Sequence, residues 1–249
     1  MRLVAIITFA VLVGTLTGLA QDKVDGFSAR VYQNNRHEKM PYRLFIPANY
    51  DKSKKYPLII WLHGAGGAGD DNLKQISEDQ VAGTRIWTKP ELQTKHPAFV
   101  LVPQSAGGWA SVSTLQLSDE ERLVLEIVNS LKSEFSLDSK RIYLTGQSNG
   151  GFGVWDMISK RPDLFAAAIP LCGGGNTLLA SSLVSMPIWA FHGDQDSVIP
   201  VSETRNMIAA IKKLGGAPRY TEYKGVDHDI WLRTFKEPGL ADWLLAQHR

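Results

Sequence analysis

The stretch 141–151, "RIYLTGQSNGG", contains the pattern that decides the fold of this chain. An apolar run with strand character ends at Ser148, and Gly146 and Gly150 stand two residues to either side of that serine. A serine on a sharp turn between a buried strand and a helix is typical of a nucleophile elbow, where glycines let neighbouring backbone approach closely. The motif is a weak signal by itself, because glycine-rich turns are common. Its interpretation therefore depends on partners elsewhere in the chain.

Strand-like and helix-like segments alternate on both sides of this motif. Two early runs, 27–34 and 40–48, alternate polar and apolar residues, as half-exposed antiparallel strands do. The later runs are mostly continuous apolar stretches, typical of parallel strands covered on both faces: 56–64, 98–104, 141–147, 165–173, 188–193 and 219–225. Helical patterns occur at 118–135, 151–162, 202–216 and 238–249. The sequence predicts one α/β domain over 21–249, with a mostly parallel central sheet flanked by helices and no large lid.

The first twenty residues have the composition of a targeting segment. Arg2 is their only charged residue, and the small residues Gly18 and Ala20 end an uncharged apolar stretch. This pattern predicts a signal peptide over 1–20, cleaved after Ala20, and therefore a secreted or periplasmic protein. A retained membrane anchor is the alternative, because the apolar stretch could nearly span a bilayer.

Composition excludes several classes of function. The formal net charge of +2 and the lack of runs of like charge argue against a nucleic-acid partner, and no membrane association is expected once the signal is removed. Cys172, the single cysteine, cannot form an internal disulfide and is expected to be a buried, inert thiol. Neither an HExxH motif nor paired cysteine ligands occur, so the sequence predicts no metal and no cofactor. Oligomeric state stays open.

A serine nucleophile requires a base, and His228 is the best candidate. It lies in "GVDHDIW", after the last strand run and before the final helical segment. His63 and His192 each precede a glycine at the end of an apolar run, where a histidine is expected to brace a loop by hydrogen bonding. The remaining histidines lie in polar or terminal segments and are expected at the surface: His37, His96 and His248.

The acid that orients this histidine is predicted to be Asp196. "HGDQDSVIP" offers Asp194 and Asp196 directly after an apolar strand run, and Asp196 lies further into the loop. Asp194 is expected to fix the loop through backbone hydrogen bonds. Asp227 and Asp229 flank His228, but adjacent side chains in an extended segment point apart. The predicted order is serine, aspartate, histidine, which is the order of the α/β-hydrolase fold.

An oxyanion hole completes the predicted site. The glycine-rich loop "LHGAGGAGDDN" (62–72) follows a strand at the position where this fold takes one of its two backbone donors. We assign one N–H to Ala65 and the other to Asn149, the residue after the nucleophile. A phosphate-binding loop is the alternative, but the Gly-Lys-Ser/Thr ending of a P-loop is missing.

These motifs resemble a known family. The segments "PLIIWLHGAGGAGDDN", "RIYLTGQSNGGFGVWD", "FAAAIPLCGGG", "IWAFHGDQDSVIP" and "YTEYKGVDHDIW" are similar to those of secreted α/β-hydrolases of the peptidase/esterase group. That group is similar to phospholipase/carboxylesterases and to feruloyl and acetylxylan carbohydrate esterases. The resemblance covers roughly residues 40–247 and implies Ser148, Asp196 and His228 as the catalytic triad. The family usually has Ser-Met-Gly-Gly at the elbow, whereas this chain has Asn149 in place of the methionine, which puts acyl preference in doubt.

The resulting prediction is a secreted serine hydrolase that cleaves carboxylic esters, of small molecules or of polysaccharides, through an acyl-enzyme on Ser148. Trp109 and Trp231 are predicted to lie on loops facing the cleft and to contact the substrate, although packing in the core is an equal alternative. Two other functions stay open. One is a serine peptidase acting on short peptides, and the other is a carbohydrate-binding protein on a catalytically dead hydrolase fold.

Overall fold

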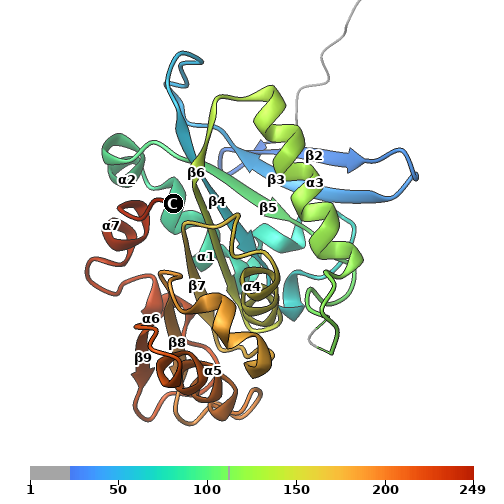
Figure 1. The fold of residues 1–249 in the computed structure, drawn as a ribbon. Coiled ribbons are helices and arrows are strands. Elements are labelled where there is room, and N and C mark those ends of the chain that lie inside the picture. Colours follow the sequence, from blue (N-terminus) through green and yellow to red (C-terminus); the bar gives the residue numbers. More distant parts are fainter. Residues whose placement is uncertain (1–22, 112) are drawn as a thin grey trace, which may run out of the picture.

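The computed structural model of the chain describes residues 23–111 and 113–249, and a nine-stranded sheet forms its centre (Figure 1). The order of strands across the sheet is β1-β2-β3-β5-β4-β6-β7-β8-β9. Their bounds are β1 (Lys23–Val24), β2 (Phe27–Gln33), β3 (Lys39–Phe45), β4 (Tyr56–Leu62), β5 (Phe99–Pro103), β6 (Leu137–Gln147), β7 (Ala167–Leu171), β8 (Trp189–Gly193) and β9 (Arg219–Tyr223). The first three strands pair antiparallel, as does β3 with β5, and every pair from β5 to β9 is parallel. The predicted α/β fold with a mostly parallel sheet is confirmed.

Helices cover both faces of this sheet. One hydrophobic cluster contains residues of α3 (Asp119–Glu134), α4 (Asn149–Lys160), α5 (Ser202–Lys213) and the 3-10 helix η4 (Thr177–Leu183). A second cluster contains residues of α1 (Val81–Thr88), α6 (Trp231–Thr234) and α7 (Leu240–Leu245). The remaining short elements are α2 (Pro90–Lys95), η1 (Ala65–Gly67), η2 (Lys74–Ile76) and η3 (Glu78–Gln80).

The central strands read as apolar runs because both of their faces are covered. In β4, Leu58 and Ile60 belong to the first cluster, whereas Ile59 and Trp61 belong to the second. Successive side chains of a strand point to opposite faces, so a strand buried on both sides has no polar alternation. This arrangement brings the carboxyl ends of β4, β6, β7 and β8 to one edge of the sheet, where ligands bind in such folds.

The structure differs from the sequence prediction in the segment 65–97. No helix was expected there, yet α1, α2 and three 3-10 helices occupy it. Gly83 lies inside α1, where glycine weakens helix propensity, and a Cβ at this position would lie 2.1 Å from the Trp61 ring. Gly83 therefore has two effects. It lowers the helix propensity of this segment, so the sequence did not predict a helix, and it allows α1 to pack closely on the sheet.

Two predictions on the N-terminal segment fall outside the described residues. They are the signal peptide over 1–20 and its cleavage after Ala20, and both stay predictions. None of the helices in the described part of the chain has both the length and the apolarity needed to cross a membrane.

Candidate active site

Ser148 lies on the sharp turn between β6 and α4 and has a strained backbone. Its φ is +54°, a value that residues other than glycine rarely adopt. The neighbouring glycines allow this turn. A Cβ on Gly146 would lie 2.6 Å from the carbonyl oxygen of Gly150, and a Cβ on Gly150 would lie 2.0 Å from that of Leu62. The spacing seen in the sequence is thus required by contacts between β4, β6 and α4.

The structure brings Ser148, His228 and Asp196 together. Nε2 of His228 lies 2.9 Å from Oγ of Ser148, and Nδ1 lies 2.7 Å from Oδ2 of Asp196. The side chain of Asp196 is 0% exposed and that of His228 is 16% exposed. The carboxylate of Asp196 is therefore fully buried, whereas part of the His228 imidazole is accessible to solvent. This geometry, a hydroxyl bonded to one ring nitrogen and a carboxylate to the other, is that of a nucleophile–base–acid triad.

Hydrogen bonds keep the Asp196 carboxylate ionised. Oδ1 accepts the backbone N–H groups of Val198 and Ile199 at 2.9 and 2.7 Å. Burial acts to raise the pKa of Asp196, but the hydrogen bonds from His228 and from these two amides outweigh it and hold the pKa below its ordinary value. The carboxylate is therefore negative at neutral pH and available to stabilise a positive imidazolium.

The other acids of this region fix the two loops. Asp194 accepts the N–H of Gly225 at 2.6 Å, as expected from its position nearer the strand. Asp227 accepts the backbone N–H and the hydroxyl of Ser197 at 2.7 and 2.9 Å, together with the N–H of His228 at 2.7 Å. These bonds tie the Asp196 loop to the His228 loop and so set the distance between acid and base.

Ala65 and Asn149, the predicted oxyanion-hole residues, each begin a helix that follows a central strand. Ala65 is the first residue of η1 and Asn149 the first of α4, and the first N–H groups of a helix have no partner within it. The strands that lead to them are neighbours, since Leu62 pairs with Gly146. The preceding amide, that of Gly64, is already bonded to Oε1 of Gln80 at 2.8 Å, which leaves Ala65 as the first available donor of the loop.

Trp109 does not lie where the sequence placed it. Its side chain is 0% exposed and belongs to the core, and its indole N–H donates to the carbonyl oxygen of His63 at 3.0 Å. This corrects the expectation that its ring faces the substrate. Loop position alone did not reveal that Gly153 of α4 packs directly on this ring, where a Cβ would lie 2.5 Å from Cβ of Trp109.

Trp231 lies beside the triad. It is 6% exposed, and its ring stands perpendicular to that of His228 with the centroids 5.3 Å apart. It also lines a cavity of about 350 Å³ between α1 and α6. The opposite wall includes Asp79, whose Oδ2 accepts the side-chain N–H of Gln147, the residue before Ser148. Both walls of this cavity thus adjoin the triad.

A larger cavity of about 650 Å³ lies elsewhere. Tyr56 and Pro57, at the amino end of β4, line it together with Arg141, in the first half of β6. That edge of the sheet is opposite the one that carries Ser148, so we do not assign the substrate to it.

Asn149 and His63 have contacts that the sequence did not reveal. Oδ1 of Asn149 accepts the backbone N–H of Trp109 at 3.1 Å, and Nε2 of His63 accepts that of Ser105 at 3.0 Å. Burial lowers the pKa of His63, in agreement with this accepting role. The expected brace at His63 is thus present, and the side chain that replaces the usual methionine holds the 105–109 loop to the elbow.

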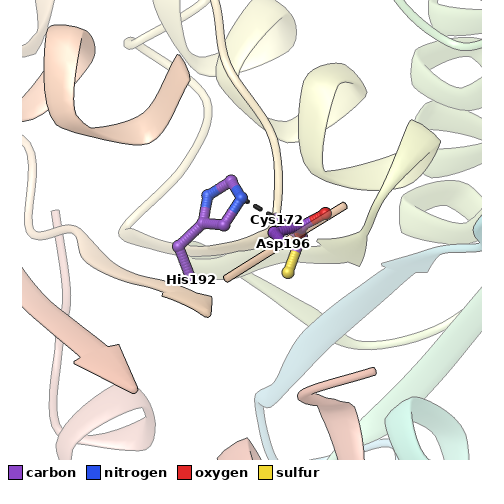
Figure 2. Close-up of side chains that lie close together, drawn as sticks. All are labelled: Cys172, His192 and Asp196. Atoms are coloured by element: carbon purple, nitrogen blue, oxygen red, sulfur yellow. Dashed lines mark ion pairs between the residues drawn. The ribbon is translucent and has the colours of Figure 1, made fainter. Parts of the chain in front are cut away.

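Cys172 and His192 surround the triad acid (Figure 2). Their ligand atoms and those of Asp196 lie within 4.8 Å of one another, the one such group of three found in the described residues. Thiolate, imidazole and carboxylate are ligands that zinc accepts. Here, however, burial raises the pKa of the Cys172 thiol, so it keeps its proton. Asp196 is already hydrogen-bonded to His228, and Nε2 of His192 lies 3.1 Å from it. We interpret the group as support for the carboxylate.

Comparison with known proteins agrees with this geometry. Residues 43–234 match the model of the dienelactone hydrolase family. The chain is 26% identical over 178 residues to a bifunctional acetylxylan esterase/xylanase of Neocallimastix patriciarum, covering 71% of this chain and 24% of that protein. It is 28% identical over 170 residues to a probable feruloyl esterase C of Aspergillus terreus, covering 64% of this chain and 56% of that protein. Among solved structures, a thermostable esterase superposes with a TM-score of 0.85 at 36% identity, over 90% of this chain and 64% of that one.

The predicted resemblance to feruloyl and acetylxylan esterases is confirmed by these relatives, of which this chain spans about a quarter to just over half. The family model covers most of the described domain and includes the elbow, the acid and the histidine. The chain belongs to the dienelactone hydrolase family.

Proposed function

We propose that this protein is a serine hydrolase that cleaves carboxylic esters through an acyl-enzyme on Ser148. The observation that carries the proposal is the unbroken chain of hydrogen bonds from Ser148 through His228 to Asp196. Relatives named as esterases support an ester as the substrate. Neither a metal nor a cofactor enters the proposed reaction.

In the proposed reaction each group of the site has one role. Nε2 of His228 takes the proton from Oγ of Ser148 as the oxygen bonds to the ester carbonyl carbon. The carbonyl oxygen becomes negative, and the N–H groups of Ala65 and Asn149 stabilise it. His228 then protonates the leaving alcohol as the carbon–oxygen bond breaks. A water repeats the sequence on the acyl-enzyme, giving its proton to His228 and releasing the acid, and the proton returns to Ser148.

The cavity between α1 and α6 supports an ester with an apolar or aromatic group. Val81, Ile86, Leu232 and Phe235 line it together with Trp231, and charged side chains lie at its rim: Glu78, Asp79, Arg85, Lys89, Asp229 and Lys236. The apolar lining includes Trp231, which packs on His228, and it suits an aryl or short alkyl group, while the charged side chains suit the hydroxyl-rich part of a sugar. Acyl esters of carbohydrates and small acyl esters fit both features.

Labelling with a fluorophosphonate tests the serine. We expect stoichiometric labelling of the native protein at Ser148 and no labelling of Ser148→Ala, with ester hydrolysis reduced by several orders of magnitude. Ser133→Ala, on the exposed face of α3, is the matched control and should behave as the native protein. Activity of Ser148→Ala within about tenfold of native would sink the proposal, as would hydrolysis of a peptide amide without turnover of the matched ester.

A filled cavity tests the substrate assignment. Ala82→Trp would occupy the space between α1 and α6. We expect kcat/KM for methyl ferulate to fall by at least tenfold while p-nitrophenyl acetate is spared, since the latter needs no room there. An equal fall for both esters would place the acyl group elsewhere.

We also propose that the protein acts outside the cytoplasm. The apolar segment 1–20 supports this, as does a curated relative described as a secreted protein of Arthroderma benhamiae, 27% identical over 214 residues. N-terminal sequencing of the exported protein should begin at Gln21. Recovery of the intact N-terminus in the membrane fraction would favour the anchor instead.

A further inference from the structure

We propose that His192 is a positioning residue for the reaction, holding the Asp196 carboxylate in the orientation that His228 requires. The inference rests on the proposed serine hydrolase function and adds a second imidazole to its triad. His192 stands in β8, four residues before Asp196, and Figure 2 shows its ring directed at that carboxylate. Nε2 of His192 lies 3.1 Å from Oδ2 of Asp196, the same oxygen that His228 contacts.

The surroundings of the ring determine where its proton lies. Nε2 of His192 faces Oδ2 of Asp196 and, at 3.0 Å, the carbonyl oxygen of Ile199. Both oxygens only accept hydrogen bonds, so Nε2 must carry a proton. Burial lowers the pKa of His192 and favours the neutral ring, in which Nδ1 is the acceptor.

The other nitrogen is held by Thr204. Its hydroxyl lies 2.8 Å from Nδ1 of His192 and 2.7 Å from the carbonyl oxygen of Gly173. The hydroxyl donates its proton to the carbonyl oxygen of Gly173, and its oxygen contacts Nδ1, so Thr204 fixes the orientation of the imidazole ring. His192 and Thr204 are both 0% exposed, so solvent cannot replace either contact.

The Asp196 carboxylate therefore has donors on both oxygens. Two imidazoles share Oδ2, and two backbone amides bond to Oδ1. The Nε2–H of His192 is hydrogen-bonded to the carbonyl oxygen of Ile199 and also lies 3.1 Å from Oδ2, so without it Oδ2 would lose one of its two imidazole contacts.

Other titratable groups face His192 from the neighbouring elements. Cys172 follows β7 and carries a neutral thiol, and His228 lies across the shared carboxylate. On β9, Glu222 is the register partner of His192, but Arg205 of α5 binds this carboxylate with two bonds of 2.7 and 2.8 Å. Asp196 is thus the anionic partner that His192 contacts directly.

Three variants test the proposal, measured by kcat, KM and the pH profile of kcat/KM with p-nitrophenyl acetate. His192→Leu keeps the volume and removes the donor; we expect kcat to fall roughly 10- to 100-fold, the effect of one hydrogen bond to a charged group, with KM nearly unchanged. The acid limb of the profile should move to higher pH, because a more basic carboxylate makes His228 easier to protonate. His192→Gln places an amide N–H near the Nε2 position and should restore most of kcat and the native profile.

Thr204→Val covers the case in which His192→Leu fails to fold. It retains the imidazole but removes the hydroxyl that contacts Nδ1 and orients the ring, so we expect a smaller fall in kcat and a smaller shift in the same direction. An unmoved pH profile in folded variants would overturn the positioning role, as would a Gln variant no better than Leu. The proposed hydrolase function is tested separately by Ser148→Ala. Retained activity of that variant would overturn the function, whatever the His192 variants show.

Discussion

Asp196 and Glu121 are both buried carboxyl groups, and their surroundings give them opposite charge states. Burial acts to raise the pKa of each. Asp196 accepts hydrogen bonds from His228 and from two backbone amides, which hold its pKa below the ordinary value. Glu121 faces the carboxylate of Asp156, and burial together with this negative neighbour raises its pKa to about 8. The partners of a buried acid, and not burial alone, decide whether it is charged.

Glu121 belongs to a buried cluster with Asp156 and Lys160, and this cluster has a structural role. Oε2 of Glu121 accepts the N–H of Ser118 and closes a capping box at the start of α3. Asp156 accepts the N–H of Ser111 at 2.7 Å, and Lys160 donates to the carbonyl oxygens of Ser111 and Gln116. Oε1 of Glu121 and Oδ1 of Asp156 have no other hydrogen-bond partner in the structure, in keeping with a proton shared between the two acids. This cluster fastens the segment before α3, whereas Asp196 contacts His228.

Removing the charge of Asp196 should have the largest effect. Asp196→Asn keeps the shape but cannot hold His228 in the correct tautomer, so kcat should fall roughly 10⁴-fold. Asp194→Asn is the matched control, since Asp194 contacts Gly225 and not the imidazole. Steady-state rates with one soluble ester measure both. A crippled Asp194→Asn beside a mild Asp196→Asn would reverse the assignment.

In the cluster of Glu121, Asp156 and Lys160, replacing Lys160 should lower the stability of the protein most. The side chains of Lys160 and Asp156 are 3% and 1% exposed and lie 2.7 Å apart. Lys160→Met leaves Asp156 buried without its cation, which should cost roughly 3–5 kcal/mol in the free energy of unfolding. Urea denaturation at pH 7 measures this, with the exposed Lys213→Met expected to change it by about 0.5 kcal/mol or less. Equal midpoints for the two variants would show that the buried pair contributes nothing.

Replacing Glu121 should alter the pH dependence of stability. A carboxyl whose pKa rises on folding, here from 4.5 to about 8, stabilises the fold fully below the lower value. That contribution is lost as pH rises through the upper one. Melting temperatures of the native protein should therefore fall between about pH 5 and 8.5, and those of Glu121→Gln should fall less, because its amide can donate to Asp156 without ionising. Parallel curves would argue against a protonated Glu121.

The candidate site could be predicted to a large extent from local patterns. Ser148 was found because strand, glycines and helix are consecutive in the chain, and the same holds for Asp196 after β8. His228 followed from its order relative to these two. Their roles in catalysis stay predictions, but the structure places the three side chains within hydrogen-bonding distance.

The sequence by itself determined the elements whose signals are contiguous: the apolar parallel strands, the elbow at Ser148, and the loops that carry Asp196 and His228. Only the tertiary structure decided that Trp109 is buried, that α1 packs on Trp61 through Gly83, and that the ring of His192 lies beside Asp196. The physical reason is the range of the interactions. Hydrophobic periodicity and turn residues involve neighbours in the chain and can be recognised in the sequence. Burial, charge state and the contacts of a carboxylate depend on which distant segments of the chain pack together.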